Sequence, residues 1–166
     1  MPALVIRPFQ PPDAERVWRI LEPVIRAGET YALPREMSRD EALHYWTVQP
    51  AACFVAGTGE DVTGTFYIRT NQPGGGAHVC NAGFMVAADA GGRGIGRAMG
   101  ERALVEARRL GYTAMQFNFV LASNTRAIRL WQYLGFATVG RLPGVFRHPS
   151  LGFVDALVMH RDLTTR

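Results

Sequence analysis

The 166-residue sequence lacks any long apolar run, and no basic segment followed by a hydrophobic stretch opens it. These absences argue against a transmembrane helix and a secretory signal peptide, so we expect no membrane partner and a cytoplasmic location. Cysteine is scarce, because only Cys53 and Cys80 are present, each within an apolar strand-like segment. We expect two small buried hydrophobic residues rather than a disulfide or a metal pair, and therefore no metal.

Massed basic charge, internal repeats and low-complexity segments are also lacking. The formal net charge of +4 could favour a polyanionic partner, but the basic residues are dispersed and no nucleic-acid-binding motif appears. We therefore expect no nucleic-acid partner. A hydrophobic content of 48% suits one domain over residues 1–166 that buries its own core. Whether the chain forms a homodimer stays open at this stage.

What the sequence does have is a glycine-rich stretch at residues 91–96, followed directly by a helical pattern that ends at Leu110. Glycines let the backbone turn tightly and bring successive N–H groups close to a ligand. The following helix adds unpaired N–H groups and a positive dipole end, which together suit a pyrophosphate. Arg93, Arg97 and Arg102 add positive charge nearby. The plain alternative is a loop that only turns the chain.

Three phosphate-binding patterns compete for this stretch. A P-loop needs Lys and then Ser or Thr after its last glycine, where this chain has Arg97 and Ala98. The dinucleotide fingerprint needs a third glycine in phase, which is missing. The stretch instead resembles the acetyl-CoA-binding motif of the GNAT superfamily of acetyltransferases, Gln/Arg-x-x-Gly-x-Gly/Ala. Gly94 and Gly96 match this motif, and Gly91 stands in place of its Gln or Arg.

The rest of the chain predicts a mixed α/β fold. Strand patterns cover residues 4–7, 52–56, 62–70, 77–86, 115–121, 137–140 and 153–160. One helix should start at an Asp13 N-cap, with a kink or early end at Pro23, and finish at Ala27-Gly28. The Ser38–Glu41 capping box should open another, to about residue 48. Hairpins followed by alternating strands and helices predict a mixed sheet with helices on its faces.

A second motif lies in the helical segment at residues 124–134. Asn124, Ala127, Leu130 and the Gly135-Phe136 pair match the GNAT pattern Asn-x-x-Ala-x-x-Leu-Tyr-x-x-x-Gly-Phe, while Trp131 replaces its Tyr. Together with the glycine motif, the resemblance covers nearly the whole chain. It implies the GNAT fold, in which a single mixed sheet of six to seven strands has a bulged, splayed central strand and helices on both faces. It also implies acetyl-CoA as the donor of an acetyl group.

The resemblance implies roles for individual residues. Backbone groups of Phe84, Met85 and Val86 would hold the pantetheine arm and the thioester carbonyl. Gly83 would allow a bulge that splays this strand, or would serve packing alone. Asn124 would bond the pantetheine arm, although a helix cap is a sufficient role for it. The implied cofactor-binding residues are Phe84, Met85, Val86, Gly91, Gly92, Arg93, Gly94, Ile95, Gly96, Asn124 and Trp131.

A narrower resemblance concerns the acceptor of the acetyl group. It is carried by Asn81, Phe84, Phe117-Asn118, Trp131, Val139-Gly140-x-x-Pro143 and Val154-Asp155-Ala156. These residues resemble the subgroup that contains yeast acetyltransferases of toxic proline analogues such as azetidine-2-carboxylate. The implied acceptor is the amine of a small molecule, in particular a cyclic secondary amino acid. Tyr31, Asn81, Phe84 and Asn118 would contact it, unless the two asparagines only bond within the fold.

Acetyl transfer needs a neutral amine, a polarised thioester carbonyl and a proton for the leaving thiolate. The resemblance implies that the family's Tyr can give this proton, whereas Trp131 in its place cannot, so water or the acceptor amine would deliver it. A backbone N–H beside the bulge, helped by the Asn118 side chain, would polarise the carbonyl, and Asn81 would join Asn118 in catalysis. No carboxylate lies on the 77–86 strand, so Glu29, Tyr31, His78 and a water chain stay open as the base. Two other functions also stay open: acetylation of proteins or peptides, and CoA binding without catalysis. The loops at residues 29–34 and 143–152 would cover a small-molecule site.

Overall fold

The computed structural model describes residues 2–165, which form one seven-stranded mixed sheet. The strand order is β1-β2-β3-β4-β5-β7-β6, in which β4 and β5 run parallel and the other described neighbours run antiparallel. The strands are β1 (Val5–Pro8), β2 (Ala52–Thr58), β3 (Asp61–Thr70), β4 (Val79–Val86), β5 (Ala114–Leu121), β6 (Ala137–His148) and β7 (Gly152–Asp162). The expected mixed sheet of six to seven strands is confirmed.

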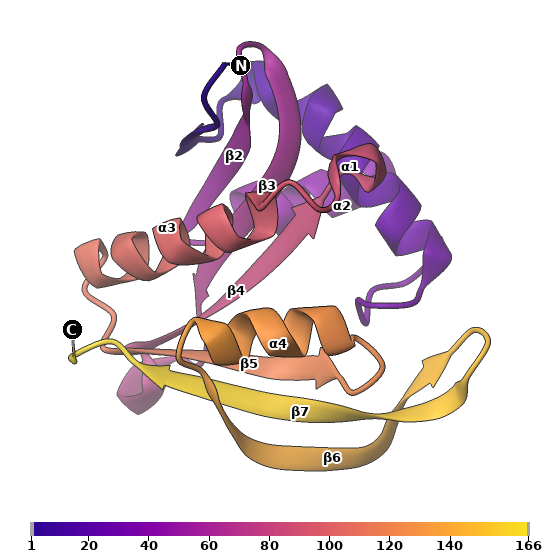
Figure 1. Cartoon of the computed structure of the whole chain (residues 1–166), viewed down its shortest axis with the longest axis vertical. Helices are drawn as coiled ribbons and strands as arrows, with labels where there is room; N and C mark the ends of the chain where they lie inside the picture. The colour runs from indigo at the N-terminus through magenta and orange to yellow at the C-terminus, as the bar shows by residue number, and fades with distance from the viewer. Residues whose placement is uncertain (1, 166) are drawn as a thin grey trace.

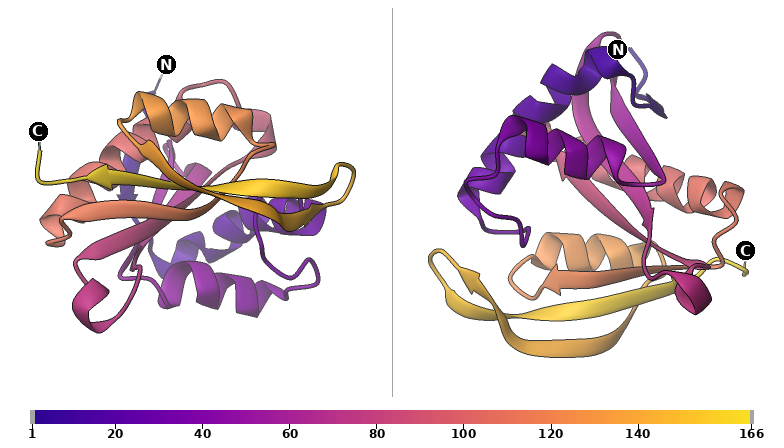
Figure 2. Two further views of the ribbon diagram at one scale, coloured as in Figure 1. Left: turned by 90° about the horizontal axis from the view of Figure 1, so that it is seen from below. Right: turned by 180° about the vertical axis from the view of Figure 1, so that it is seen from behind.

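Helices cover both faces of this sheet, as the sequence predicts (Figure 1). They are α1 (Ala14–Ala27), α2 (Arg39–Leu43), the π-helical turn His44–Val48 that continues α2, α3 (Ile95–Arg109) and α4 (Thr125–Tyr133), with short 3₁₀ turns at Pro11–Asp13, Gly74–Gly76 and Ala88–Ala90. The helices α1 and α2 pack on one face in a core around Leu21, Trp46 and Tyr67. The helices α3 and α4 pack on the other face around Met99 and Trp131, and Figure 2 shows both layers from two further sides.

Asp13 occupies the N-cap position of α1, as predicted, but its side chain makes no capping bond to that helix. Its carboxylate instead accepts from the Gln10 backbone N–H at 2.9 Å and forms an ion pair with Arg7 at 2.7 Å. The helix also runs through Pro23 without an early end, because this residue lies on the exposed side, where water can bond the carbonyl that proline leaves unpaired. It finishes as predicted at Gly28, which has a left-handed φ of 64°.

The two C-terminal strands are longer than the patterns predicted. The first, β6, continues from Ala137 to His148 through Pro143, and its pairing with β7 is irregular between Leu142 and Phe146. Proline is tolerated here because β6 is an edge strand, whose outer N–H groups need no ladder partner. Residues 143–152, which were expected to form a covering loop, therefore form the turn end of a long β6–β7 hairpin.

The strands β4 and β5 separate soon after they meet. Within residues 2–165 their pairing is limited to Val79 with Ala114 and Cys80 with Met115, so the predicted splay is confirmed. The bulge predicted at Gly83 is not found, because the register of β3 with β4 is continuous through it. The packing alternative explains this glycine, since a Cβ there would lie 2.5 Å from Cε1 of Tyr67.

Both cysteines are buried and free, as expected. Burial raises the pKa of the Cys53 thiol and of the Cys80 thiol to about 12, so each stays protonated near neutral pH. No helix within residues 2–165 is long and apolar enough to cross a membrane.

Candidate functional site

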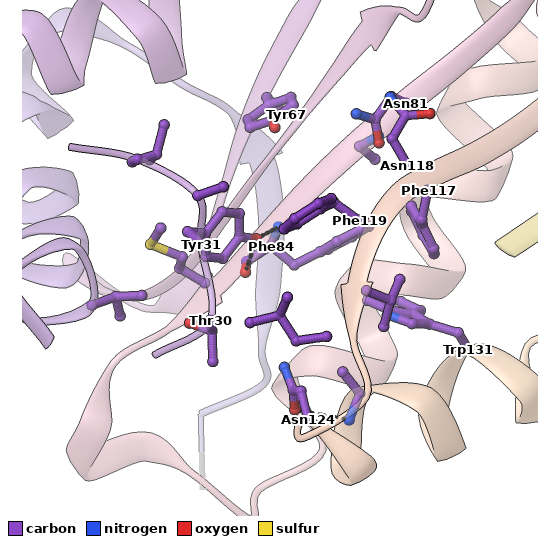
Figure 3. A pocket seen from close by; sticks show the side chains of 18 of the residues that line it. Thr30, Tyr31, Tyr67, Asn81, Phe84, Phe117, Asn118, Phe119, Asn124 and Trp131 are labelled. Atoms are coloured by element: carbon purple, nitrogen blue, oxygen red, sulfur yellow. Dashed lines mark hydrogen bonds between the residues drawn. The ribbon is translucent and has the colours of Figure 1, made fainter. Parts of the chain in front are cut away.

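Two adjoining cavities lie where β4 and β5 splay. The smaller has a volume of about 350 Å³ and the larger a volume of about 530 Å³. They share the lining residues Thr30, Phe84, Val86, Asn124, Ala127 and Trp131. Because these residues line both, the two cavities adjoin at the end of β4. Figure 3 shows the smaller cavity from close by.

The larger cavity contains the glycine-rich stretch and the start of α3. Gly91, Gly92, Gly94 and Gly96 all line it. Gly92 and Gly94 have left-handed φ values of 78° and 75°, and an added Cβ at either would meet nothing within 4 Å. The Ala98 N–H bonds the carbonyl of Gly94, so the preceding three N–H groups of the helix are left for a ligand. The stretch therefore has the backbone geometry of an anion cradle.

Positive charge lies at this cradle, although not as the sequence predicted it. Arg97 lines the larger cavity, with an ion pair to Glu101 at 2.9 Å. Arg126 also lines the larger cavity, although the sequence patterns did not predict it. Its position on the first turn of α4, next to Ala127 of the GNAT pattern, could have indicated it. Arg93 and Arg102 are not among the lining residues: one bonds the Asp89 carbonyl and the other forms an ion pair on α3.

The smaller cavity is uncharged, because none of its lining residues in the described part of the chain carries a formal charge. Its polar groups are the hydroxyls of Thr30 and three tyrosines and the amides of Asn81, Asn118 and Asn124. Tyr31 and Asn81 were predicted; Thr30, Tyr45 and Tyr67 were missed, because strand and loop patterns do not show which side chains converge. Among the bases considered, His78 and Glu29 do not line either cavity, whereas Tyr31 does.

Tyr31 bonds the backbone of Phe84 twice. Its hydroxyl donates to the Phe84 carbonyl at 2.7 Å and accepts from the Phe84 N–H at 2.8 Å (Figure 3). These backbone groups face the splay, where β5 has stopped pairing with β4. Burial raises the pKa of the Tyr31 hydroxyl far above its usual value, so the hydroxyl stays protonated and can serve both bonds.

Asn81 and Asn118 lie together at one end of the smaller cavity and apart from the Tyr31–Phe84 hydrogen bonds (Figure 3). The side-chain oxygen of Asn81 accepts a hydrogen bond from the Ala82 backbone N–H at 2.8 Å. Asn118 donates to Asn71 at 2.6 Å and accepts from Gln116 at 2.9 Å. Asn118 thus belongs to a chain of amides at this end of the cavity, so its expected help to a carbonyl at the Phe84 N–H gains no support from these bonds.

Arg69 lies behind the tyrosines of this cavity, and the sequence patterns did not predict it there either. Its guanidinium stacks on the rings of Tyr45 and Tyr67, at 4.3 and 4.2 Å from their centroids. It donates to the Tyr45 carbonyl at 2.9 Å, while its buried Nε has no hydrogen-bond partner within residues 2–165. Arg69 is the register partner of Asn81, so both side chains stand on the same face of the sheet.

Trp131 and Asn124 line the junction of the two cavities. Trp131 is buried and packs against Phe84 and Phe117, with ring centroids 4.9 and 4.6 Å apart. Asn124 caps α4 as predicted, since its side chain accepts from the Ala127 N–H at 3.3 Å. Its amide nitrogen is not used by that bond, so capping and ligand binding are compatible.

Comparisons with known proteins agree with this geometry. Residues 16–136 match the sequence model of the acetyltransferase (GNAT) family. The N-acetyltransferase aca1 of Schizosaccharomyces pombe is 32% identical over 151 residues, which cover 81% of this chain and 72% of that protein. A GCN5-related N-acetyltransferase from Kribbella flavida has a similar structure, with a TM-score of 0.92 and 40% identity over 96% of this chain and 98% of that chain. The yncA protein of Salmonella typhimurium, solved with acetyl-CoA, shares the fold at a TM-score of 0.85 and 22% identity, over 97% of this chain and 94% of that chain.

Proposed function

The chain belongs to the acetyltransferase (GNAT) family, and from this premise we infer that it transfers acetyl from acetyl-CoA to the amine of a small amino acid. The observation that carries the proposal is the meeting of two unlike cavities at Phe84. One has a glycine cradle and two arginines, which suit a phosphate-bearing donor. The other is small and uncharged, which suits a compact acceptor. A donor and an acceptor bound in these cavities would react at their junction.

The residues of the larger cavity fit acetyl-CoA. The N–H groups at the start of α3 would hold the pyrophosphate, with Arg126 beside them. The backbone of residues 84–86 and the free amide nitrogen of Asn124 would hold the pantetheine arm. When bound, acetyl-CoA supplies a thioester whose carbonyl carbon is attacked by an amine. The Phe84 N–H is the donor that would polarise the carbonyl oxygen.

The uncharged lining of the smaller cavity supports a neutral amine as the reacting form. A protonated amine would lose its hydration there and find no carboxylate in return, which favours the deprotonated nucleophile. Among residues 2–165, no carboxylate or histidine lines the cavity to accept the proton of the acceptor amine. We therefore assign that role to a water chain leading out of the cavity, with the tyrosine hydroxyls as its hydrogen-bond partners.

Arg69, Asn81 and Asn118 indicate where the carboxylate of an amino-acid acceptor would bind. A free amino acid carries a carboxylate, which needs a positive charge and hydrogen-bond donors once it leaves water. Asn81 and Asn118 offer amide N–H groups, and the Arg69 guanidinium lies behind the tyrosines with its Nε unpaired. This set of donors favours binding of free amino acids over binding of peptides, which present an amide in place of that carboxylate. The sequence resemblance to acetyltransferases of proline analogues extends the proposal to cyclic secondary amino acids.

Release of CoA thiol from acetyl-CoA across a panel of amines tests this function. The panel contains proline, azetidine-2-carboxylate, small primary amino acids, peptides with free N-termini and a lysine-containing peptide with a blocked N-terminus. We expect the small amino acids, with the cyclic secondary amines among the best, to give the largest kcat/KM. A clear preference for peptides would favour a protein N-acetyltransferase. Cofactor binding without thiol release for any amine would favour a non-catalytic CoA-binding module.

A further inference from the structure

The Phe84 N–H has a hydrogen-bond partner within the chain itself. It donates to the Tyr31 hydroxyl at 2.8 Å, and that hydroxyl donates in turn to the Phe84 carbonyl at 2.7 Å. Both bonds close on a single residue of β4 at the point where the two cavities meet. The Tyr31 oxygen therefore lies at hydrogen-bond distance from the donor that the proposed reaction needs for the thioester carbonyl.

Tyr31 serves the fold in this position. Buried backbone N–H and C=O groups need partners, and past Cys80 the strand β5 no longer supplies them to β4. A phenolic hydroxyl can donate and accept at the same time, so one side chain satisfies both groups of Phe84. Neither a carboxylate nor an ammonium group could make this pair of bonds.

The segment that carries Tyr31 is fixed at its ends. Arg26 donates to the Met37 carbonyl at 2.8 Å, and Arg35 donates to the Arg26 carbonyl at 2.8 Å. Between these anchors Tyr31 contacts Trp46 edge-on, with ring centroids 5.9 Å apart. The segment can thus release the Tyr31 side chain while its ends stay on α1.

We propose that the Tyr31 hydroxyl holds the place of the acetyl oxygen in the ligand-free protein, and that acetyl-CoA displaces it while CoA leaves it in place. The inference rests on the proposed function, because it takes the Phe84 N–H as the donor to the thioester carbonyl. CoA ends in a thiol and has no carbonyl to compete for that N–H. Tyr31 is in this sense a specificity-determining residue, since its displacement distinguishes the acetylated donor from the product.

Displacement also links the two substrates. Tyr31 lines the smaller cavity, so its release changes the shape of the acceptor site only when an acetyl group is present. After transfer, the N–H of Phe84 is free again and the hydroxyl returns to it. The acceptor site would then be complete with acetyl-CoA bound and altered with CoA bound, which favours binding of the donor before the acceptor.

Calorimetric titration of acetyl-CoA and of CoA into the parent chain, Tyr31→Phe and Tyr112→Phe tests the proposal. Tyr112 is a matched control, because its hydroxyl bonds Thr70 at 2.7 Å and it does not line either cavity. Tyr31→Phe removes the competitor, so the ratio of CoA to acetyl-CoA dissociation constants should rise by roughly 3- to 10-fold, the scale of one net hydrogen bond. Tyr112→Phe should leave the ratio unchanged.

The outcomes separate this inference from the proposed function. If the parent chain binds neither ligand, the proposed function fails. If it binds both and Tyr31→Phe shifts the two affinities equally, or not at all, Tyr31 is only a structural support and the displacement is overturned. Should Tyr31→Phe not fold, nuclear Overhauser contacts between the Tyr31 and Trp46 rings of the parent chain give the answer. Acetyl-CoA should weaken them and CoA should keep them; the same response to both ligands would overturn the proposal.

Discussion

The backbone of Gly83 lies against the ring of Tyr67, so close that a Cβ on the glycine would stand 2.5 Å from Cε1 of that ring. Tyr67 is buried and lines the smaller cavity, which means that this contact fixes one wall of the proposed acceptor site. Gly83→Ala should therefore lower the free energy of unfolding by about 1–3 kcal/mol through overpacking. Urea denaturation measures this. Gly75→Ala is the control, because a Cβ there meets nothing within 4 Å; equal stabilities of the two variants would contradict the packing argument.

The buried Asp13 carboxylate gives the stability of the chain a dependence on pH. The hydrogen bond from Arg7 holds the pKa of Asp13 below its usual value despite burial. A folded-state pKa below the unfolded value of about 3.9 means that the stabilisation is present above that pH and is lost as pH falls through the lower, folded value. Asp13→Asn should cost about 1–3 kcal/mol at pH 7, the scale of hydrogen bonds to a charged group. In urea denaturation the cost should shrink at pH 3; a cost that does not change with pH would refute the linkage.

The cradle at the start of α3 should reject a ligand anion once it carries its own negative charge. Gly96 is a helical residue whose Cβ would lie 3.7 Å from Leu130, so Gly96→Asp introduces no backbone strain. An acid in the first turn stabilises a helix by about 0.3–1 kcal/mol, so the free variant should melt no lower than the parent. We expect the rise in melting temperature caused by acetyl-CoA to disappear. Gly96→Ala, which adds bulk without charge, should keep most of that rise. A full rise in Gly96→Asp would show that the pyrophosphate binds elsewhere.

Arg69 should affect the use of the acceptor amino acid and not the binding of acetyl-CoA. Replacement by Met removes the charge behind Tyr45 and Tyr67 while keeping an apolar side chain between these two rings. The preference for an amino acid over its carboxamide, compared as kcat/KM, should fall by roughly tenfold, whereas the KM for acetyl-CoA should hold. Arg19→Met, at an exposed residue of α1, serves as the control. An unchanged preference would remove Arg69 from the account of the acceptor.

Trp131 should act through packing rather than as a proton donor. Its ring is buried against Phe84 and Phe117, and an indole N–H does not ionise usefully near neutral pH. With saturating acetyl-CoA, Trp131→Phe should keep turnover within about tenfold of the parent, and Asn118→Ala should lose more through its acceptor contact. If the folded Trp131→Phe variant loses more than about a hundredfold, the scale for a removed general acid, the packing role is wrong.

Much of the fold could be predicted because local signals and tertiary packing agree. The Ser38 capping box, the left-handed Gly28 and the Asn124 cap form where the patterns place them. The failures occur where tertiary context decides. Pro143 lies outside the strand pattern of residues 137–140, yet β6 continues through it, because β6 is an edge strand whose outer side has no ladder to break. Gly83 suggests a bulge, yet its lack of a Cβ serves the ring of a residue on the neighbouring strand.

The candidate site also has one part that the sequence could predict and another that it could not. The glycine cradle is continuous in sequence, so its spacing was enough to predict it. The proposed acceptor end is assembled from residues of the α1–α2 loop, β3, β4 and β5, and no linear pattern brings Arg69 or Tyr67 to Asn81. The two hydrogen bonds between the Tyr31 hydroxyl and the Phe84 backbone could not be predicted for the same reason, because the two residues stand 53 positions apart in the sequence.

The central claim is acetyl transfer to the nitrogen of a small amino acid at the junction of the two cavities. It is tested most directly by incubating the chain with isotopically labelled acetyl-CoA and a cyclic secondary amino acid, and by measuring free thiol and N-acetylated product together. We predict that label appears in the N-acetyl amino acid in step with thiol release, and that both fall together in Gly96→Asp. Thiol release without labelled product, or acetyl-CoA binding with neither, would contradict the claim.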